Sequence, residues 1–270
     1  MYLKYYNLSE FPFSITPDPR FLYWTDQHRE AFDYLLYGIQ SRKGFIAFTG
    51  EVGSGKTTLC RAVLSSLGED VATALLLNPS LSETQLLRSM LNDFGLPVQG
   101  RDRLAYIETL NEFLLSKNRE GANVALVIDE AQNLSPQIME QVRLLSNLET
   151  DQHKLIQIVL CGQPELDARL NRSDLRQLRQ RITVRFRLDP LTRDDISPYI
   201  QHRLHVAGSD GRLIFEESAL REIHKYAQGS PRLVNAVCDG ALMAGYVDRT
   251  RAIGAGHVKR AIKLLGGPSA

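Results

Sequence analysis

The sequence is short of cysteine and contains no long apolar run. Its three cysteines, Cys60, Cys161 and Cys238, are odd in number and widely spaced. This pattern predicts buried thiols in a reducing compartment and argues against disulfides or a zinc set. No apolar run approaches the roughly 18 residues of a membrane span, and the amino terminus lacks the basic-then-apolar pattern of a signal peptide. These features predict a cytoplasmic protein without a span of its own.

Excess charge of either sign is also missing. Lys and Arg number 32 and Asp and Glu number 31, for a formal net charge of +1, so binding to DNA or membranes through overall charge is not expected. The six histidines show no metal-ligand spacing, which favours structural or surface roles. With 43% hydrophobic and 23% charged residues, the 270-residue chain has the composition of a soluble globular protein with one or two domains.

One glycine-rich segment is the strongest functional signal. Residues 50–57 read Gly-Glu-Val-Gly-Ser-Gly-Lys-Thr and fit G-x-x-x-x-G-K-[ST], the phosphate-binding loop of P-loop NTPases. A strand-like apolar run at 44–49 precedes it and a predicted helix at 57–67 follows, so bound phosphates would meet a helix N-terminus. In this context a chance match in a glycine-containing loop is the weaker interpretation.

The residue types in this loop suit phosphate chemistry. Gly50, Gly53 and Gly55 allow a concave backbone whose N–H groups point at phosphate oxygens. Lys56 is predicted to reach the β- and γ-phosphates, and the Thr57 hydroxyl is predicted to bind Mg²⁺. The predicted nucleotide-binding residues are Gly50, Glu51, Val52, Gly53, Ser54, Gly55, Lys56, Thr57 and Thr58.

An apolar run that ends in two acids completes the pattern. Residues 123–130 read Asn-Val-Ala-Leu-Val-Ile-Asp-Glu, which predicts a central parallel strand buried on both faces. Asp129 is then expected at the carboxyl end of the sheet, where α/β folds place ligands, holding Mg²⁺ through its water shell. Glu130 is expected to polarise the attacking water. An isolated acidic pair would more often begin a solvated loop, but the upstream P-loop favours the catalytic interpretation.

The order of apolar runs predicts an α/β fold, a parallel sheet sandwiched by helices, followed by a helical lid. Further strands are expected at 72–78, 155–161 and 182–188, and helices at 82–94, 102–117 and 137–148. From Thr192 onward no strand is expected, only helices at 194–206, 216–228, 231–247 and 256–265. The predicted domains are an arm with a helix near 27–40 (1–43), a nucleotide-binding domain (44–190) and an all-helical lid (191–267).

A P-loop sheet followed by a helical domain is the plan of an AAA+ ATPase, and the chain resembles that family at further positions. Gln163 follows the strand that ends at Cys161 and matches the sensor 1 residue, which contacts the γ-phosphate or the lytic water. A turn residue without catalytic contact is the alternative. Gly229-Ser-Pro-Arg232 resembles the sensor 2 motif, in which the arginine, here Arg232, reaches back to the γ-phosphate.

The resemblance also implies an arginine finger that acts on the neighbouring subunit's site. The segment Leu-Arg-Gln-Leu-Arg-Gln-Arg before the last predicted strand offers Arg176, Arg179 and Arg181, of which Arg181 is favoured because it lies nearest that strand. A solvated basic helix or a set of interface ion pairs is the alternative for any two of them. The seven arginines in this region are also dense enough to contact a nucleic-acid backbone, although only Phe186 is interleaved as an aromatic.

A longer string of motifs is similar to the ExeA/GspA group of AAA+ ATPases. The motifs are Asp129-Glu-Ala-Gln132, Leu144 to Thr150, Gly162 to Leu166, Leu175 to Arg181 and Gly229 to Arg232, with a similar start at Tyr6 to Pro19. In type II secretion that group pairs with an inner-membrane partner and helps assemble the outer-membrane secretin. Its best-known members continue into a transmembrane helix and a periplasmic peptidoglycan-binding domain, so this chain is expected to be either a cytoplasmic fragment or a member of a shorter branch.

The resemblance predicts a Mg²⁺-dependent ATPase that self-assembles into a homo-oligomer and drives assembly or remodelling of a protein partner, with recruitment to the inner membrane face. Two alternatives stay open. One is a DNA-binding AAA+ regulator of the transposition type, and the other is a binding module that holds nucleotide with little turnover. Glu130 favours turnover, because a pure switch does not need a water-activating carboxylate.

Overall fold

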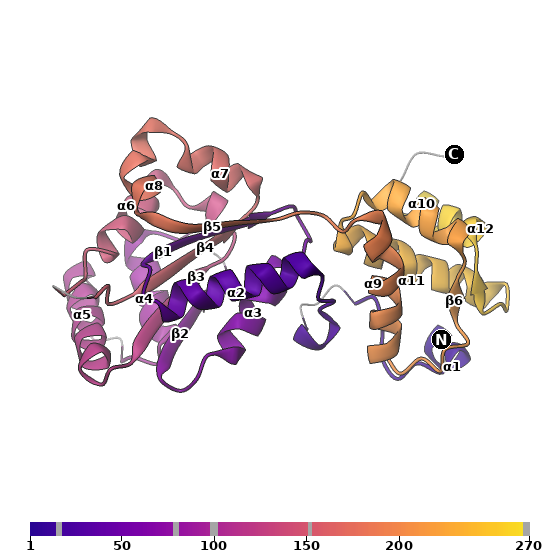
Figure 1. Cartoon of the computed structure of the whole chain (residues 1–270), viewed down its shortest axis with the longest axis horizontal. Helices are drawn as coiled ribbons and strands as arrows, with labels where there is room; N and C mark the ends of the chain where they lie inside the picture. Colours follow the sequence, from indigo (N-terminus) through magenta and orange to yellow (C-terminus); the bar gives the residue numbers. More distant parts are fainter. Residues whose placement is uncertain (15–17, 78–80, 98–101, 151–152, 267–270) are drawn as a thin grey trace. The chain divides into compact units, whose positions relative to one another are not determined.

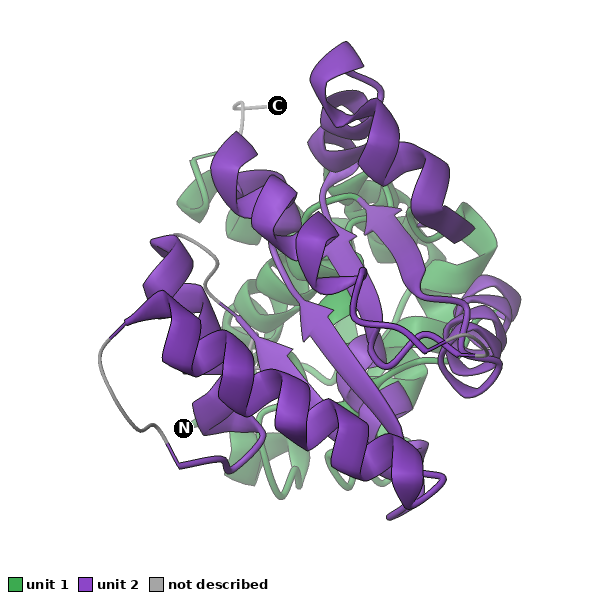
Figure 2. Cartoon of the chain, turned by 90° about the vertical axis from the view of Figure 1, so that its left-hand side faces the viewer, with its two compact units in different colours: residues 1–25, 51–58, 189–270 green, residues 26–50, 59–188 purple. Residues whose placement is uncertain are grey.

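The computed structural model describes residues 1–14, 18–77, 81–97, 102–150 and 153–266. The chain divides into two compact units, coloured separately in Figure 2. The sheet unit comprises residues 26–50 and 59–188, and the helical unit comprises residues 1–25, 51–58 and 189–270. The glycine-rich loop therefore groups with the helical unit, although its neighbours in sequence belong to the sheet unit. The domain boundaries placed after residues 43 and 190 from the sequence stay predictions.

Five parallel strands form the sheet, in the order β2-β3-β4-β1-β5, which confirms the predicted α/β fold. Every residue of β1, β3 and β4 is buried, because parallel strands in the middle of such a sheet are covered on both faces. β4 begins two residues later than predicted and β2 ends at Leu76; Asn78, also predicted as strand, lies outside the described residues. The strands are β1 (Phe45–Gly50), β2 (Val71–Leu76), β3 (Asn123–Ile128), β4 (Gln157–Gly162) and β5 (Ile182–Leu188).

Helices cover both faces of this sheet, with α2 on one side and α7 and α8 on the other (Figure 1). Phe45 and Ala47 of β1 join a core with residues of α4, α5 and α6. The next residue along, Ile46, faces α2, where a Cβ on Gly38 would lie 2.6 Å from Ile46 Cδ1. The helices are α2 (Asp26–Gln40), α3 (Lys56–Ser66), α4 (Glu83–Asp93), α5 (Arg103–Arg119), α6 (Pro136–Leu145), α7 (Pro164–Leu170) and α8 (Arg176–Arg181).

Polar caps start three of these helices close to their predicted first residues. Ser82 Oγ accepts a hydrogen bond from Gln85 N, and the Gln85 side chain accepts one from Ser82 N at 2.8 Å, which forms a capping box. Asp102 and Ser135 cap α5 and α6 through their side-chain oxygens, and Pro136 occupies the first position of α6. These signals lie within a few residues of one another, so the sequence alone shows them.

The helical unit contains the four helices expected after residue 192, each within two residues of its predicted bounds. The expectation that no strand follows there is wrong, because β6 (Ile214–Phe215) and β7 (Ala252–Ile253) form a short parallel pair. Strands of two residues are too short to show an alternation of apolar residues. The unit contains α1 (Tyr2–Tyr6), α9 (Arg193–Val206), α10 (Glu217–Ala227), α11 (Pro231–Val247) and α12 (Ala255–Leu264).

The amino-terminal arm is built into the core of the helical unit. Tyr6 is fully buried, and its hydroxyl lies 3.1 Å from the carbonyl oxygens of both Leu242 and Thr250. Arg203 of α9 donates to the Pro12 carbonyl at 2.6 Å, and its guanidinium lies 4.8 Å from the ring centroid of Phe21. Pro17, part of the proline-rich stretch in the arm, lies outside the described residues.

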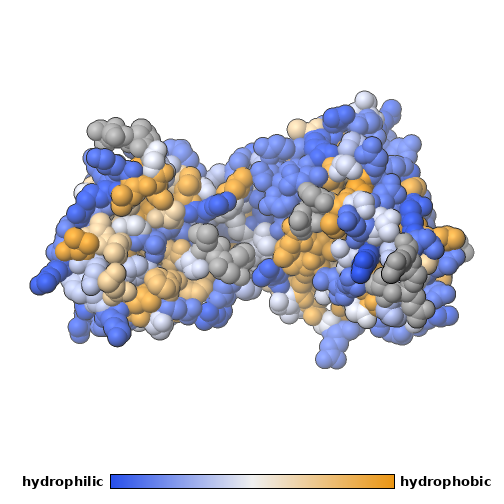
Figure 3. All heavy atoms as spheres, turned by 180° about the vertical axis from the view of Figure 1, so that it is seen from behind, coloured by the Kyte–Doolittle hydropathy of each residue, from blue (hydrophilic) through white to orange (hydrophobic). Residues whose placement is uncertain are grey.

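Polar residues dominate the outside of the molecule and apolar ones the inside. On the face shown in Figure 3, hydrophilic residues cover much of the surface, and hydrophobic residues form separate areas. Within the described ranges, no helix is long and apolar enough to cross a membrane. Cys60, Cys161 and Cys238 are all buried as free thiols.

Candidate functional site

The glycine-rich loop joins β1 to α3 and has the backbone conformation that its sequence predicts. Gly53 and Gly55 have φ angles of +74° and +95°, a region that residues with a Cβ rarely adopt. Ser54 N donates to the Glu51 carbonyl at 3.1 Å, which closes a turn. Lys56 Nζ donates to the same carbonyl at 2.8 Å. The lysine therefore folds back over the loop, where a phosphate-binding lysine is needed.

The predicted sensor 2 segment packs against this loop inside the helical unit. A Cβ on Gly53 would lie 2.4 Å from the Cβ of Arg232, and Ser230 Oγ donates to the Val52 carbonyl at 3.3 Å. Arg232 itself is exposed. The start of α11 thus rests on the loop through backbone and Cβ atoms, while the Arg232 guanidinium is accessible to a ligand.

Gly229 holds this segment in place. Its φ angle is +77°, and a Cβ there would lie 2.2 Å from the Leu191 carbonyl oxygen. Leu191 N in turn donates to the Gly229 carbonyl at 2.9 Å. Glycine is required at this position on both counts, because its backbone conformation and its close approach to residue 191 exclude a side chain.

The two acids at the end of β3 begin a tight turn. Asp129 N donates to the Leu76 carbonyl at 2.8 Å, which places Asp129 beside the end of β2. Glu130 N donates to Asp129 Oδ1 at 2.9 Å, and Glu130 has a φ angle of +52°. A left-handed conformation at a residue other than glycine is strained, and such strain is concentrated at functional sites.

Two glutamine amides hold the Glu130 carboxylate. Gln163 Nε2 donates to Glu130 Oε2 at 3.0 Å, and Gln132 Nε2 donates to the same oxygen at 2.5 Å. The structure therefore brings Gln163 to the acid that is predicted to polarise water. The sequence analysis did not identify Gln132 as a site residue; its only signal was its place in the Asp-Glu-Ala-Gln motif.

These residues lie at one edge of the sheet because the strands that carry them are parallel neighbours. β4 lies between β3 and β1, so the carboxyl ends of all three strands meet at the same edge, where α/β proteins bind ligands. Asp129 follows β3, Gln163 follows β4, and Gly50 ends β1 and begins the glycine-rich loop.

The arginines proposed as fingers differ in what they contact. Arg181 donates through Nη1 to Ser146 Oγ and Asn147 Oδ1, both at 2.6 Å, and so holds the end of α6. Arg176 and Arg179 are exposed, and the Arg179 side chain has a long contact of 3.5 Å with Asn171 Oδ1. Arg176 and Arg179 are therefore freer than Arg181 to reach a second subunit; that any of the three does so stays a prediction.

Other arginines of this region are engaged within the chain. Arg169 donates to the backbone carbonyls of Gln132 and Leu134. Arg172 pairs with Asp174 at 3.1 Å, and this bond holds the pKa of the Asp174 carboxyl below its usual value. The surface that could meet nucleic acid is smaller than the sequence suggests, because part of its charge is used in local contacts.

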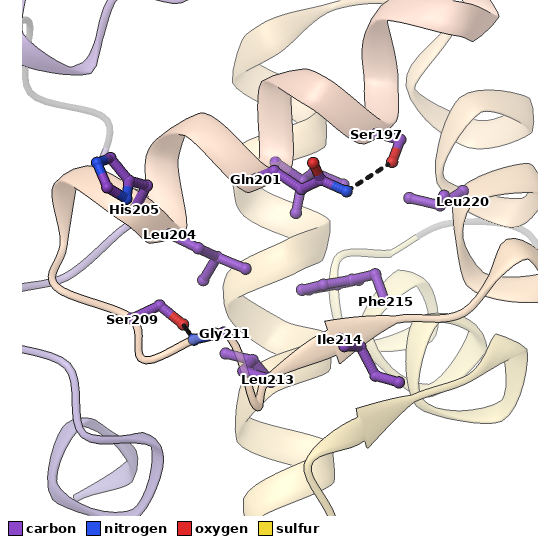
Figure 4. A pocket seen from close by; sticks show the side chains of 11 residues that line it. Ser197, Gln201, Leu204, His205, Ser209, Gly211, Leu213, Ile214, Phe215 and Leu220 are labelled. Carbon is purple, nitrogen blue, oxygen red and sulfur yellow. Dashed lines mark hydrogen bonds between the residues drawn. The ribbon is translucent and has the colours of Figure 1, made fainter.

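A separate pocket of about 360 Å³ lies in the helical unit between α9, β6 and α10 (Figure 4). Leu204 and Phe215 face its interior, and Gln201 Nε2 donates to Ser197 Oγ at 3.3 Å along its wall. The described residues that line it include no Asp, Glu, Lys or Arg. None of these side chains carries a fixed charge that would attract a phosphate.

Comparisons with known proteins agree with this geometry. A family described as AAA domain matches residues 39–170. General secretion pathway protein A of Aeromonas hydrophila is 43% identical over 268 residues, which cover 99% of this chain and 49% of that protein. The chain thus spans about half the length of this relative.

Solved structures show the same fold at low identity. Cdc6p from Pyrobaculum aerophilum superposes with a TM-score of 0.73 and 21% identity, over 94% of this chain and 70% of that chain. The ORC2 protein of Aeropyrum pernix gives a TM-score of 0.70 and 17% identity, over 94% and 71%. The motifs, the strand order and these likenesses are consistent with one another. Residues 39–170 match the AAA domain family, the chain has the fold of these solved structures, and over nearly all of its own length it is similar to general secretion pathway protein A.

Proposed function

We propose that this chain binds ATP with Mg²⁺ and hydrolyses it. The observation that carries the proposal is the Glu130 carboxylate, which Gln163 contacts at 3.0 Å at the edge where β1 leads into the glycine-rich loop. A module that only holds nucleotide has no use for an acid oriented in this way. A water-polarising carboxylate beside a sensor residue supports turnover.

Binding is assigned to the loop and to the segment that packs on it. Backbone N–H groups of residues 50–58 hold the phosphates, and Lys56 neutralises charge on the β- and γ-phosphates. Arg232, whose Cβ lies against Gly53, would respond to the γ-phosphate. The Thr57 hydroxyl and the Asp129 carboxylate would hold Mg²⁺, since oxygen ligands suit this ion. When bound, the ion neutralises charge that develops on the transferred phosphoryl group.

Hydrolysis needs a water in line with the bond between the β- and γ-phosphates. Glu130 accepts a hydrogen bond from this water and takes up its proton as the water oxygen bonds to the γ-phosphorus. The bond to the bridging oxygen breaks, and ADP leaves with its electron pair. Gln163 orients the carboxylate by donating to one of its two oxygens. The chemistry is therefore positioning and charge stabilisation, as in other P-loop ATPases.

A second copy of the chain is proposed to complete the site. The exposed arginines of α8, Arg176 and Arg179, support a guanidinium that acts on a neighbouring subunit. Arg181 is the less suitable finger, because its Nη1 contacts the end of α6. We therefore include a homo-oligomer in the proposal.

The partner is proposed to be a protein of a secretion pathway, with the chain acting at the cytoplasmic side of the inner membrane. The name of the relative from Aeromonas hydrophila and its 43% identity support this, although the chain spans 49% of that protein. DNA is the second candidate, because Arg176, Arg179 and Arg185 are exposed. We expect duplex DNA to change ATPase activity less than about twofold at physiological salt. Tight, ATP-dependent binding with strong stimulation would reverse the ranking.

Two substitutions test the division of roles. Lys56→Ala is expected to abolish ATP binding, because the lysine neutralises ground-state phosphate charge. Glu130→Gln is expected to keep ATP binding and lose turnover, because the acid acts on the water. Nucleotide titration and steady-state phosphate release measure the two effects. Loss of ATP binding in a folded Glu130→Gln variant would contradict the assignment.

A further inference from the structure

The turn after β3 contains a closed ring of side-chain hydrogen bonds. Gln132 donates through Nε2 to Glu130 Oε2 at 2.5 Å and accepts through Oε1 from Gln163 N at 3.0 Å. The Gln163 side chain closes the ring by donating through Nε2 to the same Glu130 oxygen at 3.0 Å. Both amides converge on Oε2, so the ring sets which carboxylate oxygen is engaged.

The ring allows the Gln132 amide one orientation. A backbone N–H can only donate, so the atom that faces Gln163 N must be the amide oxygen, and the NH₂ group must face the carboxylate. The room for that oxygen depends on Gly162, where a Cβ would lie 2.7 Å from Gln132 Oε1. Glycine at position 162 therefore leaves room for the amide oxygen of Gln132.

The backbone of the turn is held independently of this ring. Arg169 donates to the carbonyl of Gln132 and, at 2.5 Å, to that of Leu134. Asn133 N donates to the Glu130 carbonyl at 2.8 Å, and Leu134 N donates to the Ala131 carbonyl at 3.2 Å. Truncating the Gln132 side chain therefore removes two side-chain hydrogen bonds and leaves the turn's own backbone contacts.

We infer that Gln132 is the positioning residue that couples Gln163 to Glu130. By occupying Oε2 it turns Oε1 of Glu130 toward the attacking water, and because its amide oxygen contacts Gln163 N, any shift of Gln163 moves the carboxylate. The inference rests on the proposed role of Glu130 in hydrolysis. Gln132 thereby connects Gln163, which follows β4, directly to Glu130 in the turn after β3.

The first test separates turnover from binding. Gln132→Ala is expected to lower kcat by about 10²-fold, the scale on which small misplacements of reacting groups act, while ATP affinity changes less than about twofold. Gln132→Glu fills the same space without a donor and adds a like charge, so it is expected to be no more active than Gln132→Ala. Gln137→Ala, an exposed glutamine of α6, is the matched control and should keep wild-type kcat.

The second test uses coupled substitutions. Gly162→Ala is expected to lower kcat in the wild-type chain, because the new Cβ displaces Gln132 Oε1. It should lower kcat much less in a Gln132→Ala chain, where that oxygen is missing. A purely structural glutamine would give additive losses when Gly162→Ala and Gln132→Ala are combined.

The outcomes distinguish this inference from the proposed function. Wild-type kcat in Gln132→Ala, with Glu130→Gln inactive, overturns the positioning role and leaves hydrolysis through Glu130 intact. Wild-type turnover in Glu130→Gln overturns the proposed function itself. If Gln132→Ala melts below the assay temperature, Gln132→Glu decides the question: a low kcat at unchanged ATP affinity supports the coupling, and an unchanged kcat overturns it.

Discussion

The glycine-rich loop of the helical unit is shaped by backbone conformation, whereas the carboxylate in the acidic turn of the sheet unit is oriented by side-chain hydrogen bonds. In the loop, Gly53 and Gly55 adopt positive φ angles, and Gly53 has no room for a side chain. In the turn, Gln132 and Gln163 converge on the Glu130 carboxylate. Substitutions in the loop should therefore change nucleotide affinity, and substitutions in the turn should change turnover at nearly constant affinity.

The largest effect is expected for the arginine that is proposed to act on a neighbouring subunit. It tests whether the sheet unit of one chain is sufficient for turnover. If the exposed Arg179 serves a neighbouring site, Arg179→Ala should lower kcat by about 10³–10⁵-fold, the range found for fingers supplied in trans. Mixing this inactive chain with inactive Lys56→Ala should restore activity, since some interfaces then carry one intact loop and one intact finger. Phosphate release from the mixture measures the effect.

Two controls frame this mixing experiment. Arg172→Ala, whose guanidinium pairs with Asp174, should keep wild-type turnover. Arg181→Ala should lower the melting temperature, because the contacts with Ser146 and Asn147 are lost. Turnover that is independent of concentration in a monodisperse monomer would exclude action in trans.

A substitution in the loop tests the other half of the comparison. Gly53→Ala is expected to weaken ATP binding by more than about tenfold, since the positive φ angle costs about 1–3 kcal/mol and the new Cβ would meet the Cβ of Arg232. Gly211→Ala is the matched control, because Gly211 has a φ angle of +80° and nothing within 4 Å of its Cβ position. ATP titration of both variants checks this. Equal affinity in the two would show that the close approach at Gly53 does not matter.

Gly229 supports the loop from within the helical unit, and its replacement should act on stability first. Gly229→Ala is expected to lower the free energy of unfolding by about 1–3 kcal/mol through backbone strain, with a further loss from the clash with the Leu191 carbonyl. Thermal unfolding measures the change. Gly256→Ala, where the added Cβ meets nothing within 4 Å, should be close to neutral. A Gly229→Ala variant as stable as wild type would contradict this interpretation of the contact.

The smallest expected effect concerns an ion pair of the helical unit. Hydrogen bonds from Arg260 hold the pKa of Asp248 below its usual value, with a further contribution from the nearby His257. A depressed carboxyl pKa contributes stability above the unfolded pKa of about 3.9, and that stability is lost as the pH falls through the lower folded pKa. Asp248→Asn should thus lower the melting temperature slightly at pH 7, and the difference should vanish in acid. A difference independent of pH would exclude the ion pair as its cause.

Most of the fold could be predicted from the sequence, because the patterns that specify it are short-range. The buried runs of β1 and β3, the caps Ser82, Asp102 and Ser135, and the glycines of the loop all depend on residues within a few positions of one another. The strands β6 and β7 were not predicted, because two residues are too few to show an alternation of apolar side chains. The glycine-rich loop could be predicted for the same reason as the strands, because eight consecutive residues specify it.

The sequence by itself determined the α/β order of elements, the phosphate-binding loop and the acidic pair Asp129–Glu130, because local sterics, burial periodicity and fixed motif spacing specify them. Only the tertiary structure decided which side chains meet. Gln132 contacts Gln163 across 31 positions, Arg169 contacts the Gln132 carbonyl across 37, and Arg181 contacts Ser146 across 35. Such contacts depend on which strands become neighbours in the sheet. No local pattern in the sequence specifies which strands become neighbours. The hydrogen-bonded ring around Glu130 and the contacts of Arg181 could therefore be identified only from the tertiary structure.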